Sequence, residues 1–375
     1  MPLRISAYTF PNGTVSPTGV AKHEIEMLFA LKNLGHNVEI LAGHDQFASD
    51  GKVTTGSPLR SLPASRIPVP ARILHNVWRS FSLPVADRWC DNPDWIYTSL
   101  EQFIPSNKHP VASTIHCIHW LEPSLPWFRE RQTAKLRSKF RHRFAKIATR
   151  SDKILTVSEF LKNRITHHFK VAQDRLFVVG NGAEQEYFNL GDQRSSEKFP
   201  FDQNAPYLIN IAGLDHKKGA DLLLRFSDEL QARRSPMKLH ILGAMRGEKR
   251  FIESARQREN IRLHEYLPKN LLLPFLASAT ALVMFSRYET FGIPAVEAMA
   301  AGVPVVASEY GALPEVIADG GRIVKPSTPQ GFADEVEDLL TNTIAREHTI
   351  SLGRKRATEF TWQSCASRLE RALQS

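Results

Sequence analysis

The same strand–loop–helix–strand pattern begins twice in this chain, once in each half. The first copy runs from Leu3 to Ala42 and the second from Tyr207 to Gly243. In each copy a short apolar run is followed by a glycine-containing loop, an amphipathic helix and a second apolar run. A strand that leads through a helix to another strand is the building unit of a parallel α/β sheet. The sequence therefore predicts two similar α/β domains rather than one large sheet.

A polar, breaker-rich segment separates the two copies. It covers residues 191–204, and we expect it to be the interdomain linker. This division gives a first domain at residues 1–190, a second domain at 205–358 and a closing helix at 359–375, which we expect to cross back to the first domain. Residues 45–70 are rich in Ser, Gly and Pro, and are predicted to be a mobile loop.

The composition is that of an ordinary globular protein, with 42% hydrophobic and 23% charged residues. Its three cysteines are far apart in the sequence and form neither a disulfide framework nor a CxxC metal site. The N-terminus has no signal-peptide pattern, and no apolar run reaches the roughly 20 residues that span a bilayer. We therefore expect a soluble, cytoplasmic protein.

The net charge of +9 is concentrated in one segment. Between Arg129 and Lys153 there are ten basic residues and two acidic ones, and an apolar stripe recurs there at helical spacing, formed by Leu136, Phe140, Phe144 and Ile147. One interpretation is a solvated outer face whose stripe packs into the core. The other is peripheral contact with anionic lipid at the inner membrane face. Nucleic-acid binding is disfavoured, because no binding module or group of stacking aromatics accompanies the charge.

The most informative single stretch runs from Ser286 to Ser308. It follows the strand-like run Ala281–Phe285 and predicts a loop, a short helix and a further strand. Glu289 lies in the predicted loop and Glu297 in the predicted first helical turn. Free backbone N–H groups at a helix start attract anions, and carboxylates accept hydrogen bonds from hydroxyl groups. This combination suits a sugar that is attached to a diphosphate.

Other candidate residues have two interpretations each. Gly19 could let the backbone approach a ligand or could be a simple turn residue. Lys218, before the helix that Gly219 opens, could meet a phosphate or face solvent. His116 follows a predicted strand and could bind a hydroxyl, stabilise charge or be structural, and His119 is a rival for the same role. Neither domain has a GxGxxG or P-loop motif, which disfavours a nicotinamide enzyme or a P-loop ATPase.

Residues 286–308 resemble the E-x7-E signature of the retaining GT-B glycosyltransferases of family 4. Four further segments are similar to blocks of that family and occur in the same order: 32–40, 151–159, 178–184 and 311–315. The resemblance covers nearly the whole chain. It implies an α/β protein of GT-B architecture, in which two Rossmann-like doubly wound domains face each other across a cleft.

The resemblance also implies an activity, namely retaining transfer of a hexose-type sugar from a UDP- or GDP-linked donor to a hydroxyl acceptor, with no metal or other cofactor. By position, Glu297 would hold the nucleotide ribose and Glu289 the hydroxyls of the donor sugar. Backbone near Phe291 and Gly292 would touch the sugar as well. Lys218 would neutralise the diphosphate.

In the first domain, the resemblance implies that Gly19 approaches the diphosphate and His116 contacts the sugar, so that His116 and Glu289 are the catalytic candidates. The acceptor would bind mainly to this domain. Given the basic helix, an acceptor on a lipid carrier or a growing surface polysaccharide is expected.

One position departs from the family pattern, because Gly213 stands where an arginine usually supplies a second cation for the diphosphate. Three residues are candidates to replace it: His216, Lys217 and Arg287. Two alternative functions remain open. One is a GT-B-fold nucleotide-sugar epimerase, and the other is a nucleotide-sugar-binding protein without turnover, which Gly213 suggests.

Overall fold

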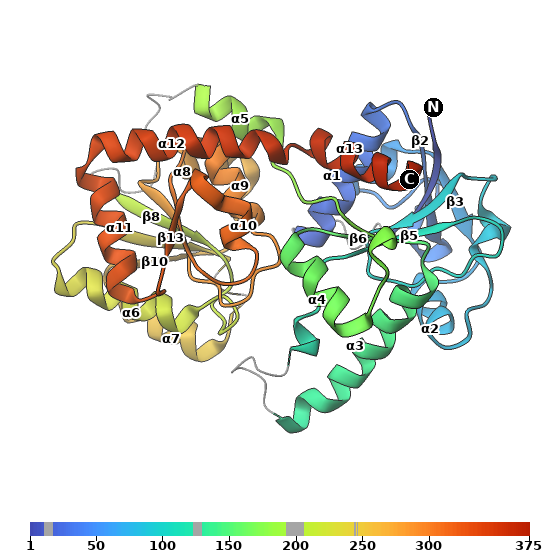
Figure 1. The fold of residues 1–375 in the computed structure, drawn as a ribbon, viewed down its shortest axis with the longest axis horizontal. Helices are drawn as coiled ribbons and strands as arrows, with labels where there is room; N and C mark the ends of the chain where they lie inside the picture. The colour runs from blue at the N-terminus through green and yellow to red at the C-terminus, as the bar shows by residue number, and fades with distance from the viewer. Residues whose placement is uncertain (11–17, 123–129, 193–205, 244, 246) are drawn as a thin grey trace. The chain divides into compact units, whose positions relative to one another are not determined.

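The computed structural model describes residues 1–10, 18–122, 130–192, 206–243, 245 and 247–375. They form two compact units, each built on its own parallel sheet (Figure 1). The first unit comprises Met1–Asn181 and Trp362–Ser375, and the second comprises Gly182–Thr361. The division falls between Asn181 and Gly182, ahead of the predicted linker. Most of that linker, 193–204, lies outside the described residues.

The first unit contains a seven-stranded sheet in which every strand pair is parallel. The strands are β1 (Arg4–Tyr8), β2 (Asn37–Gly43), β3 (Ala64–Ile67), β4 (Trp95–Thr98), β5 (Val111–Ile115), β6 (Lys153–Thr156) and β7 (Leu176–Val178). Their order across the sheet is β3-β2-β1-β4-β5-β6-β7. The predicted loop at residues 45–70 is therefore partly wrong, because it contains β3, a short edge strand with a weakly apolar sequence.

Helices cover both faces of this sheet. They are α1 (Gly19–Asn33), α2 (Ala71–Phe81), α3 (Glu130–Arg150), α4 (Glu159–Phe169) and α13 (Trp362–Gln374), with 3-10 turns at His44–Gln46, Pro58–Ser61, Ala86–Trp89, His119–Leu121 and Gln173–Arg175. The hydroxyl of Thr18 caps α1 by accepting the N–H of Ala21 at 3.2 Å, a bond that satisfies one of the free donors at a helix start.

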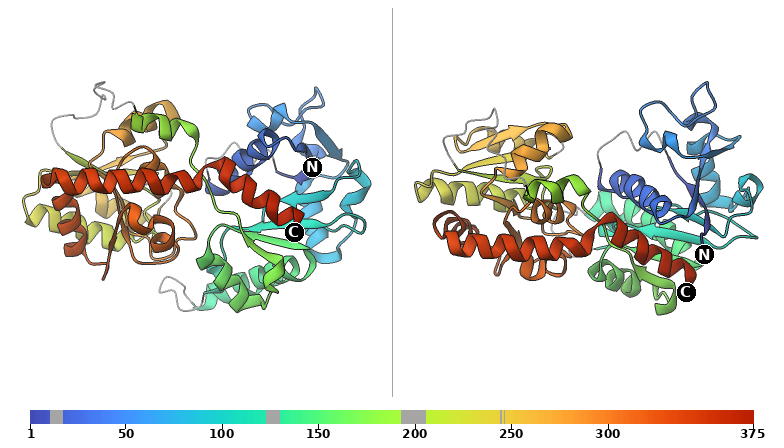
Figure 2. Two further views of the ribbon diagram at one scale, coloured as in Figure 1. Left: turned by 45° about the horizontal axis from the view of Figure 1, so that its top comes forward. Right: turned by 90° about the horizontal axis from the view of Figure 1, so that it is seen from above.

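The last helix of the chain, α13, completes the core of the first unit. It packs beside α1, and the two lie next to each other in Figures 1 and 2. Cys365, Leu369 and Leu373, which recur at helical spacing, are buried in the same apolar cluster as Met27 and Leu31 of α1. The first unit therefore depends on a segment that is more than 180 residues away in the sequence from the rest of it.

The basic helix α3 packs only one side into the protein. Phe144 and Ile147 of its apolar stripe are fully buried, whereas Leu136 is 37% exposed. The predicted stripe is thus a core contact in the C-terminal half of the helix. Along the described part of the chain, no helix combines the length and the apolar character needed to cross a membrane.

The second unit has a six-stranded parallel sheet in the order β10-β9-β8-β11-β12-β13. Its strands are β8 (Tyr207–Ile211), β9 (Lys238–Leu242), β10 (Ile261–His264), β11 (Ala281–Met284), β12 (Val305–Ser308) and β13 (Arg322–Val324). Its helices are α5 (Gln185–Asp192), α6 (Ala220–Ala232), α7 (Lys249–Arg256), α8 (Lys269–Ala277), α9 (Ile293–Ala300), α10 (Leu313–Ile317), α11 (Pro329–Thr341) and α12 (Thr343–Ala357), with 3-10 turns at Ala318–Gly320 and Thr358–Phe360.

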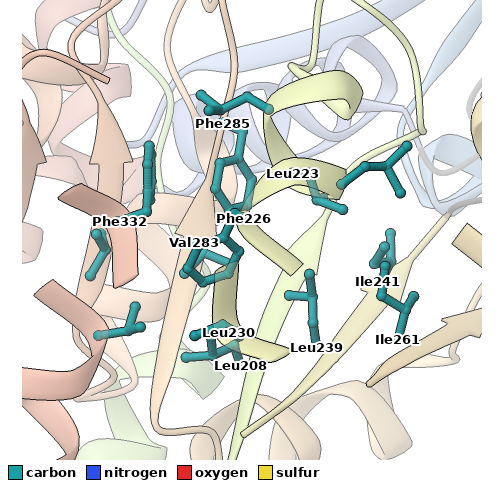
Figure 3. Close-up of a cluster of buried hydrophobic side chains, with 14 of the residues drawn as sticks. Leu208, Leu223, Phe226, Leu230, Leu239, Ile241, Ile261, Val283, Phe285 and Phe332 are labelled. Carbon is teal, nitrogen blue, oxygen red and sulfur yellow. The ribbon is translucent and has the colours of Figure 1, made fainter. Parts of the chain in front are cut away.

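The core of the second unit anchors the start of the signature stretch. Figure 3 shows Phe285, the residue after β11, among the apolar side chains under α6 and α11. Its ring lies 5.2 Å from that of Phe226 and 4.4 Å from that of Phe332, measured between centroids, and the side chain is fully buried. Burial of an aromatic ring of this size stabilises by roughly 2–3 kcal/mol, so the segment after Phe285 leaves the sheet from a fixed point.

In both sheets the order in which strands are added reverses beside the first strand. In the second unit the chain builds outward from β8 through β9 to β10, then returns to place β11 on the other side of β8. The same reversal occurs between β1 and β4 in the first unit. Doubly wound sheets bind ligands at such reversal points, beyond the carboxyl ends of the strands. A ligand-binding site is therefore expected at the loops after β8 and β11.

Candidate active site

The loop after β8 lies directly against the end of β11. Gly219 has a φ of +73°, and a Cβ on it would lie only 1.9 Å from the carbonyl oxygen of Phe285. Only glycine permits this approach of two backbones. The contact continues at the next turn, where the carbonyl of Lys217 accepts the N–H of Arg287 at 2.9 Å. Because the two loops are joined backbone to backbone, the side chain of Lys218 is carried to the residues after β11.

Lys218 and Glu289 meet at this junction. The Lys218 Nζ donates to Oε2 of Glu289 at 2.6 Å, and the N–H of Thr290 donates to Oε1 at 3.2 Å. Burial alone would raise the pKa of Glu289, but the charges of Lys218 and Lys217, together with the Thr290 N–H, outweigh burial and hold this pKa below its ordinary value. Glu289 is therefore an ionised carboxylate in a largely buried position, beside a lysine.

The backbone of Glu289 is held by the segment after β12. Its carbonyl accepts the N–H of Ala312 at 2.8 Å. A Cβ on Gly311, whose φ is +69°, would lie 2.3 Å from the same carbonyl oxygen. Gly292, with a φ of +98°, turns the chain into α9 so close to Leu313 that a Cβ would lie 2.9 Å from that side chain. The loop between β11 and α9 is thus a tightly supported turn.

Two further predicted residues are buried in the same unit. Phe291 is 3% exposed, and its ring packs edge-on against Phe360 at a centroid distance of 5.5 Å. Glu297 is 6% exposed. It lies just beyond the first turn of α9, not in the first turn as predicted, because the helix begins at Ile293. Both side chains are therefore held inside the second unit.

The start of α9 offers fewer free donors to an anion than the sequence suggested. Pro294 has no N–H, and the N–H of Ala295 donates to the carbonyl of Gly292 at 2.9 Å. A diphosphate near this turn would therefore need charge from side chains as well as from the helix start.

The structure distinguishes among the residues that could replace the arginine absent at Gly213. Arg287 forms a two-pronged pair with Asp221, with 2.6 Å between Nη2 and Oδ2, and this pairing raises the pKa of Arg287. Lys217, by contrast, lies near enough to Glu289 to help lower its pKa. Of these two, Lys217 is the better candidate for the second cation.

A cation that the sequence did not suggest also lies beside this loop. Arg250 of α7 approaches Nδ1 of His216 at 3.0 Å and pairs with Glu248 at 2.7 Å. The N–H of His216 donates to the other oxygen of Glu248 at 3.2 Å. Arg250 follows His216 by 34 residues, with α6 and β9 between them, so no local pattern could have identified it.

The first-unit candidates lie at the corresponding sheet edge of that unit. Gly19 is the first residue of α1 and is exposed. His116 directly follows β5, as predicted, and is 7% exposed. His119 lies elsewhere, in the next 3-10 turn, where its Nδ1 is 2.9 Å from the sulfur of Cys117. The two histidines therefore have different surroundings.

His116 belongs to a buried polar cluster. Its ring meets the edge of the His23 ring at 4.7 Å between centroids. Burial, opposed in part by a hydrogen bond to Asn181, lowers the pKa of His23 to about 4. Burial also lowers the pKa of His116 well below its ordinary value, with the nearby His23 adding to the effect. Both rings are therefore neutral at pH 7, which disfavours charge stabilisation by His116.

The chain is similar to known proteins over most of its length. The family model described as Glycosyltransferase Family 4 matches residues 17–187, and the one described as Glycosyl transferases group 1 matches residues 191–356. The chain is 26% identical over 287 residues to O-antigen chain mannosyltransferase B of Escherichia coli, covering 74% of this chain and 73% of that protein. It is 30% identical over 236 residues to D-inositol 3-phosphate glycosyltransferase of Corynebacterium aurimucosum, covering 58% and 55%.

The fold has solved counterparts as well. The structure of Anabaena HepE in complex with UDP-glucose superposes with a TM-score of 0.70 at 15% identity, and the match covers 99% of each chain. At this identity the likeness concerns the fold alone, while the two family models together account for nearly the whole sequence. The chain belongs to the GT-B glycosyltransferases, with a family 4 first half and a group 1 second half.

Proposed function

We propose that this glycosyltransferase moves a hexose from a UDP- or GDP-linked donor to a hydroxyl acceptor and retains the configuration at the anomeric carbon. The observation that carries the proposal is the Lys218–Glu289 contact at the reversal point of the second sheet. A lysine fixed there can neutralise a diphosphate leaving group. An ionised carboxylate next to it can accept hydrogen bonds from the hydroxyls of the attached sugar. The UDP-glucose in HepE and the mannosyltransferase activity named for the Escherichia coli relative support this donor class.

In the proposed complex, the second unit binds the donor. Glu289 accepts hydrogen bonds from hydroxyls of the sugar, and the backbone near Phe291 and Gly292 contacts the same sugar. Glu297 accepts hydrogen bonds from the hydroxyls of the ribose. Lys218 meets the diphosphate as the bond between C1 and the phosphate oxygen breaks. The new bond joins C1 to the acceptor oxygen, and the proton of the acceptor hydroxyl passes to the departing diphosphate.

For the first unit we propose that Gly19 approaches the diphosphate and that His116 contacts the transferred sugar. Because His116 is neutral, it would act as a hydrogen-bonding group and not as a cation. The reaction as proposed uses no metal or other cofactor. Lys218 would neutralise the charge of the leaving group. Lys217 would supply the second cation, because position 213 is a glycine and not the usual arginine.

Thermal unfolding with nucleotides tests the donor site. We expect UDP or GDP to raise the melting temperature of the wild-type protein, and Glu297→Ala and Lys218→Ala each to remove most of that shift. A protein whose melting temperature responds to neither nucleotide would contradict the donor-site assignment. As a control, Lys249→Ala changes a lysine that is 90% exposed in the same unit, and should leave the shift intact.

Product analysis separates the transferase from its two rivals. With a panel of nucleotide sugars and candidate acceptors, a transferase releases one nucleoside diphosphate for each new glycoside. An epimerase of the same fold would change the sugar of the donor and form no glycoside. A binding protein without turnover would show the nucleotide-dependent melting shift and no product of either kind.

We also propose that the acceptor is lipid-linked or is a surface polysaccharide, and that α3 contacts an anionic membrane. Lys135, Lys139 and Arg141 of α3 are exposed. The helix α2 contacts the C-terminal half of α3. Three apolar side chains on α2 and just after it are exposed: Ile73 at 54%, Phe81 at 74% and Leu83 at 59%. Contact between the two helices is direct, because Lys146 donates to the carbonyl of Trp78 at 2.8 Å. Exposed basic groups on one helix and exposed apolar groups on the helix that contacts it favour a lipid interface.

A further inference from the structure

The residue that holds the backbone at His116 lies in a different loop. Glu101, three residues after the end of β4, accepts the N–H of His116 at 2.8 Å and the N–H of Cys117 at 2.9 Å, both on Oε1. Its own φ is +53°, in the left-handed region. A glutamate adopts that conformation only when its surroundings hold it there.

Sheet geometry explains why a carboxylate is needed at this position. The pairing of β4 with β5 ends at Thr98 and Ser113, and the two strands lead into separate loops beyond it. The N–H groups of His116 and Cys117 therefore need another acceptor, since buried N–H groups are rarely left unpaired. The Glu101 carboxylate takes both, and hydrogen bonds to a carboxylate are among the stronger ones in proteins.

The same loop also fixes the ring of His116. Nε2 lies 2.9 Å from the carbonyl oxygen of Ser99. A carbonyl can only accept, so Nε2 carries the hydrogen of the neutral ring, and Nδ1 is left as an acceptor. In that form Nδ1 can accept a hydrogen bond from a sugar hydroxyl. The ring orientation and the backbone of His116 thus both depend on residues 99–101.

Arg143 of α3 fixes this loop from its other side. It donates through Nη2 to the carbonyl of Leu100 at 2.7 Å and through Nε to the carbonyl of Glu101. Two hydrogen bonds from one guanidinium fix the peptide planes on which the Glu101 side chain stands. This basic residue is therefore part of the internal structure, unlike the exposed lysines of the same helix.

We propose that Glu101 is a positioning residue for His116, with Arg143 holding Glu101 in place. The inference rests on the proposed function, in which His116 contacts the transferred sugar. It assigns to Glu101 an effect on turnover that passes through His116 and not through donor binding, which belongs to the second unit.

A double-mutant cycle tests this assignment in the full-length protein, with Glu101→Ala, His116→Ala and the double variant. We expect Glu101→Ala to lower kcat on the order of 10²-fold, the loss that a misplacement of about 1 Å can cause. The nucleotide-induced melting shift should stay at its wild-type size. The double variant should be no slower than His116→Ala alone, because Glu101 acts through that histidine.

Asp87 provides a matched control in the same unit. Its carboxylate also accepts two backbone N–H groups, those of Asn107 at 2.7 Å and Lys108 at 3.3 Å, in the loop that enters β5 and not the loop that leaves it. Asp87→Ala should lower the melting temperature without lowering kcat by a comparable factor. A purely structural role for Glu101 would make the two variants behave alike, and that result would overturn the proposal.

Conservative variants keep the test decisive if Glu101→Ala does not fold. Glu101→Gln retains an oxygen at the same reach and should keep kcat within about tenfold, since neutral hydrogen bonds are roughly half as strong as charged ones. Glu101→Asp keeps the charge but withdraws it from His116, and should be the slower of the two. The reverse order would overturn the positioning role.

The outcomes also separate this inference from the proposed function. If His116→Ala turned over at the wild-type rate, the role given to His116 would be wrong. If His116→Ala were slow and Glu101→Ala were not, only the positioning role would fail. An additive loss in the double variant would likewise overturn it, because two residues with additive effects act independently.

Discussion

At the residue scale, Lys218 serves two charges. Without a donor it neutralises Glu289, at 2.6 Å. A diphosphate that enters the site would add a second anion to the same ammonium group, which has three hydrogens to donate. Lys218 can then bond to phosphate and carboxylate together, and so link the leaving group to the residue proposed to hold the sugar.

The position of this lysine depends on the glycine that follows it. Replacement of Gly219 by alanine would drive a Cβ to within 1.9 Å of the Phe285 carbonyl oxygen, which no side-chain rotation can relieve. We expect Gly219→Ala to separate the two loops, to lower the melting temperature and to remove the nucleotide-induced shift. Thermal unfolding with and without UDP or GDP measures both effects.

Gly243 is the matched control for this substitution. It has a similar φ of +79° at the end of β9, but a Cβ there would meet nothing within 4 Å. Gly243→Ala should therefore cost only the strain of the left-handed backbone, about 1–2 kcal/mol. Equal losses in the two variants would show that backbone strain, and not the close approach to Phe285, explains the effect.

A buried carboxyl in the first unit predicts a dependence of stability on pH. Burial, opposed in part by the hydroxyl of Ser99 at 3.2 Å, raises the pKa of Glu24 to about 8. In the unfolded chain a glutamate titrates near 4.3. Between these values the folded state binds more protons than the unfolded state, so stability should fall as the pH rises, by at most roughly 1.4 kcal/mol per pH unit.

Glu24→Gln should remove that dependence. The variant should be more stable than the wild type at pH 8 and similar to it near pH 4, where the carboxyl is neutral in both states. Urea titrations at several pH values measure the difference between the two free energies of unfolding. If the curves for the two proteins ran parallel from pH 4 to pH 8, the raised pKa would be contradicted.

The candidate site was only partly visible in the sequence, for reasons that concern particular residues. Glu289 and Glu297 stand in one continuous motif, so the sequence alone marked them as candidates. Glu101 had no such signal, because its role comes from accepting the N–H groups of residues 15 and 16 positions later. The engagement of Arg287 with Asp221 was equally hidden, since 66 residues separate them.

At the element scale, strands with apolar sequences were the most predictable parts of the chain. The apolar runs that open and close the second copy of the repeated pattern, which extends from Tyr207 to Gly243, correspond to β8 and β9. The edge strand β3 was missed because its Ser65 and Arg66 give no apolar pattern. Edge strands have one unpaired side and can carry polar residues, so the periodicity that reveals a buried strand is absent.

The surface of α3 gives a prediction about lipid binding. We expect the triple variant Lys135→Glu, Lys139→Glu and Arg141→Glu to bind vesicles containing anionic lipid much more weakly. Each basic group near such a surface contributes about 1 kcal/mol, so reversing three should weaken binding by at least about 10²-fold. Sedimentation with vesicles of neutral and of anionic composition measures the change.

A second triple variant provides the control for charge alone. It reverses three exposed basic residues of the second unit: Lys249, Arg256 and Lys355. Vesicle binding should persist in this variant at low salt. Equal losses in both triple variants would mean that net charge, and not the face of α3, drives binding. Arg143 is left unchanged in both, because it holds the loop that contains Glu101.

At the scale of the whole molecule, the first unit is made of two separate chain segments. Deletion of residues 362–375 would remove α13, whose buried side chains include Trp362, Cys365, Leu369 and Leu373. Large-to-small changes at single buried positions already cost about 2–5 kcal/mol, and a domain is typically stable by only 5–15 kcal/mol. We therefore expect the first unit to unfold in this truncated protein at 37 °C.

Calorimetry and limited proteolysis can follow the two units separately. The truncated protein should show a transition at a much lower temperature and a protease-resistant fragment close to residues 182–361. That fragment should still gain thermal stability with UDP or GDP, if the second unit binds the donor. A single unchanged transition would contradict the dependence on α13. Removal of Gln374 and Ser375 alone should have little effect, since both are exposed.

The chain enters and leaves the second unit at neighbouring points, because Ala183 and Thr361 form a β-bridge and the N–H of Ala183 donates to the carbonyl of Phe360 at 2.9 Å. In topological terms, residues 182–361 are a cassette inserted into the first unit. A cassette whose ends lie together can be exchanged without changing the length of either host segment. If the second unit binds the donor as proposed, grafting the corresponding cassette of a relative would transplant donor preference in one step, while the host keeps its own acceptor.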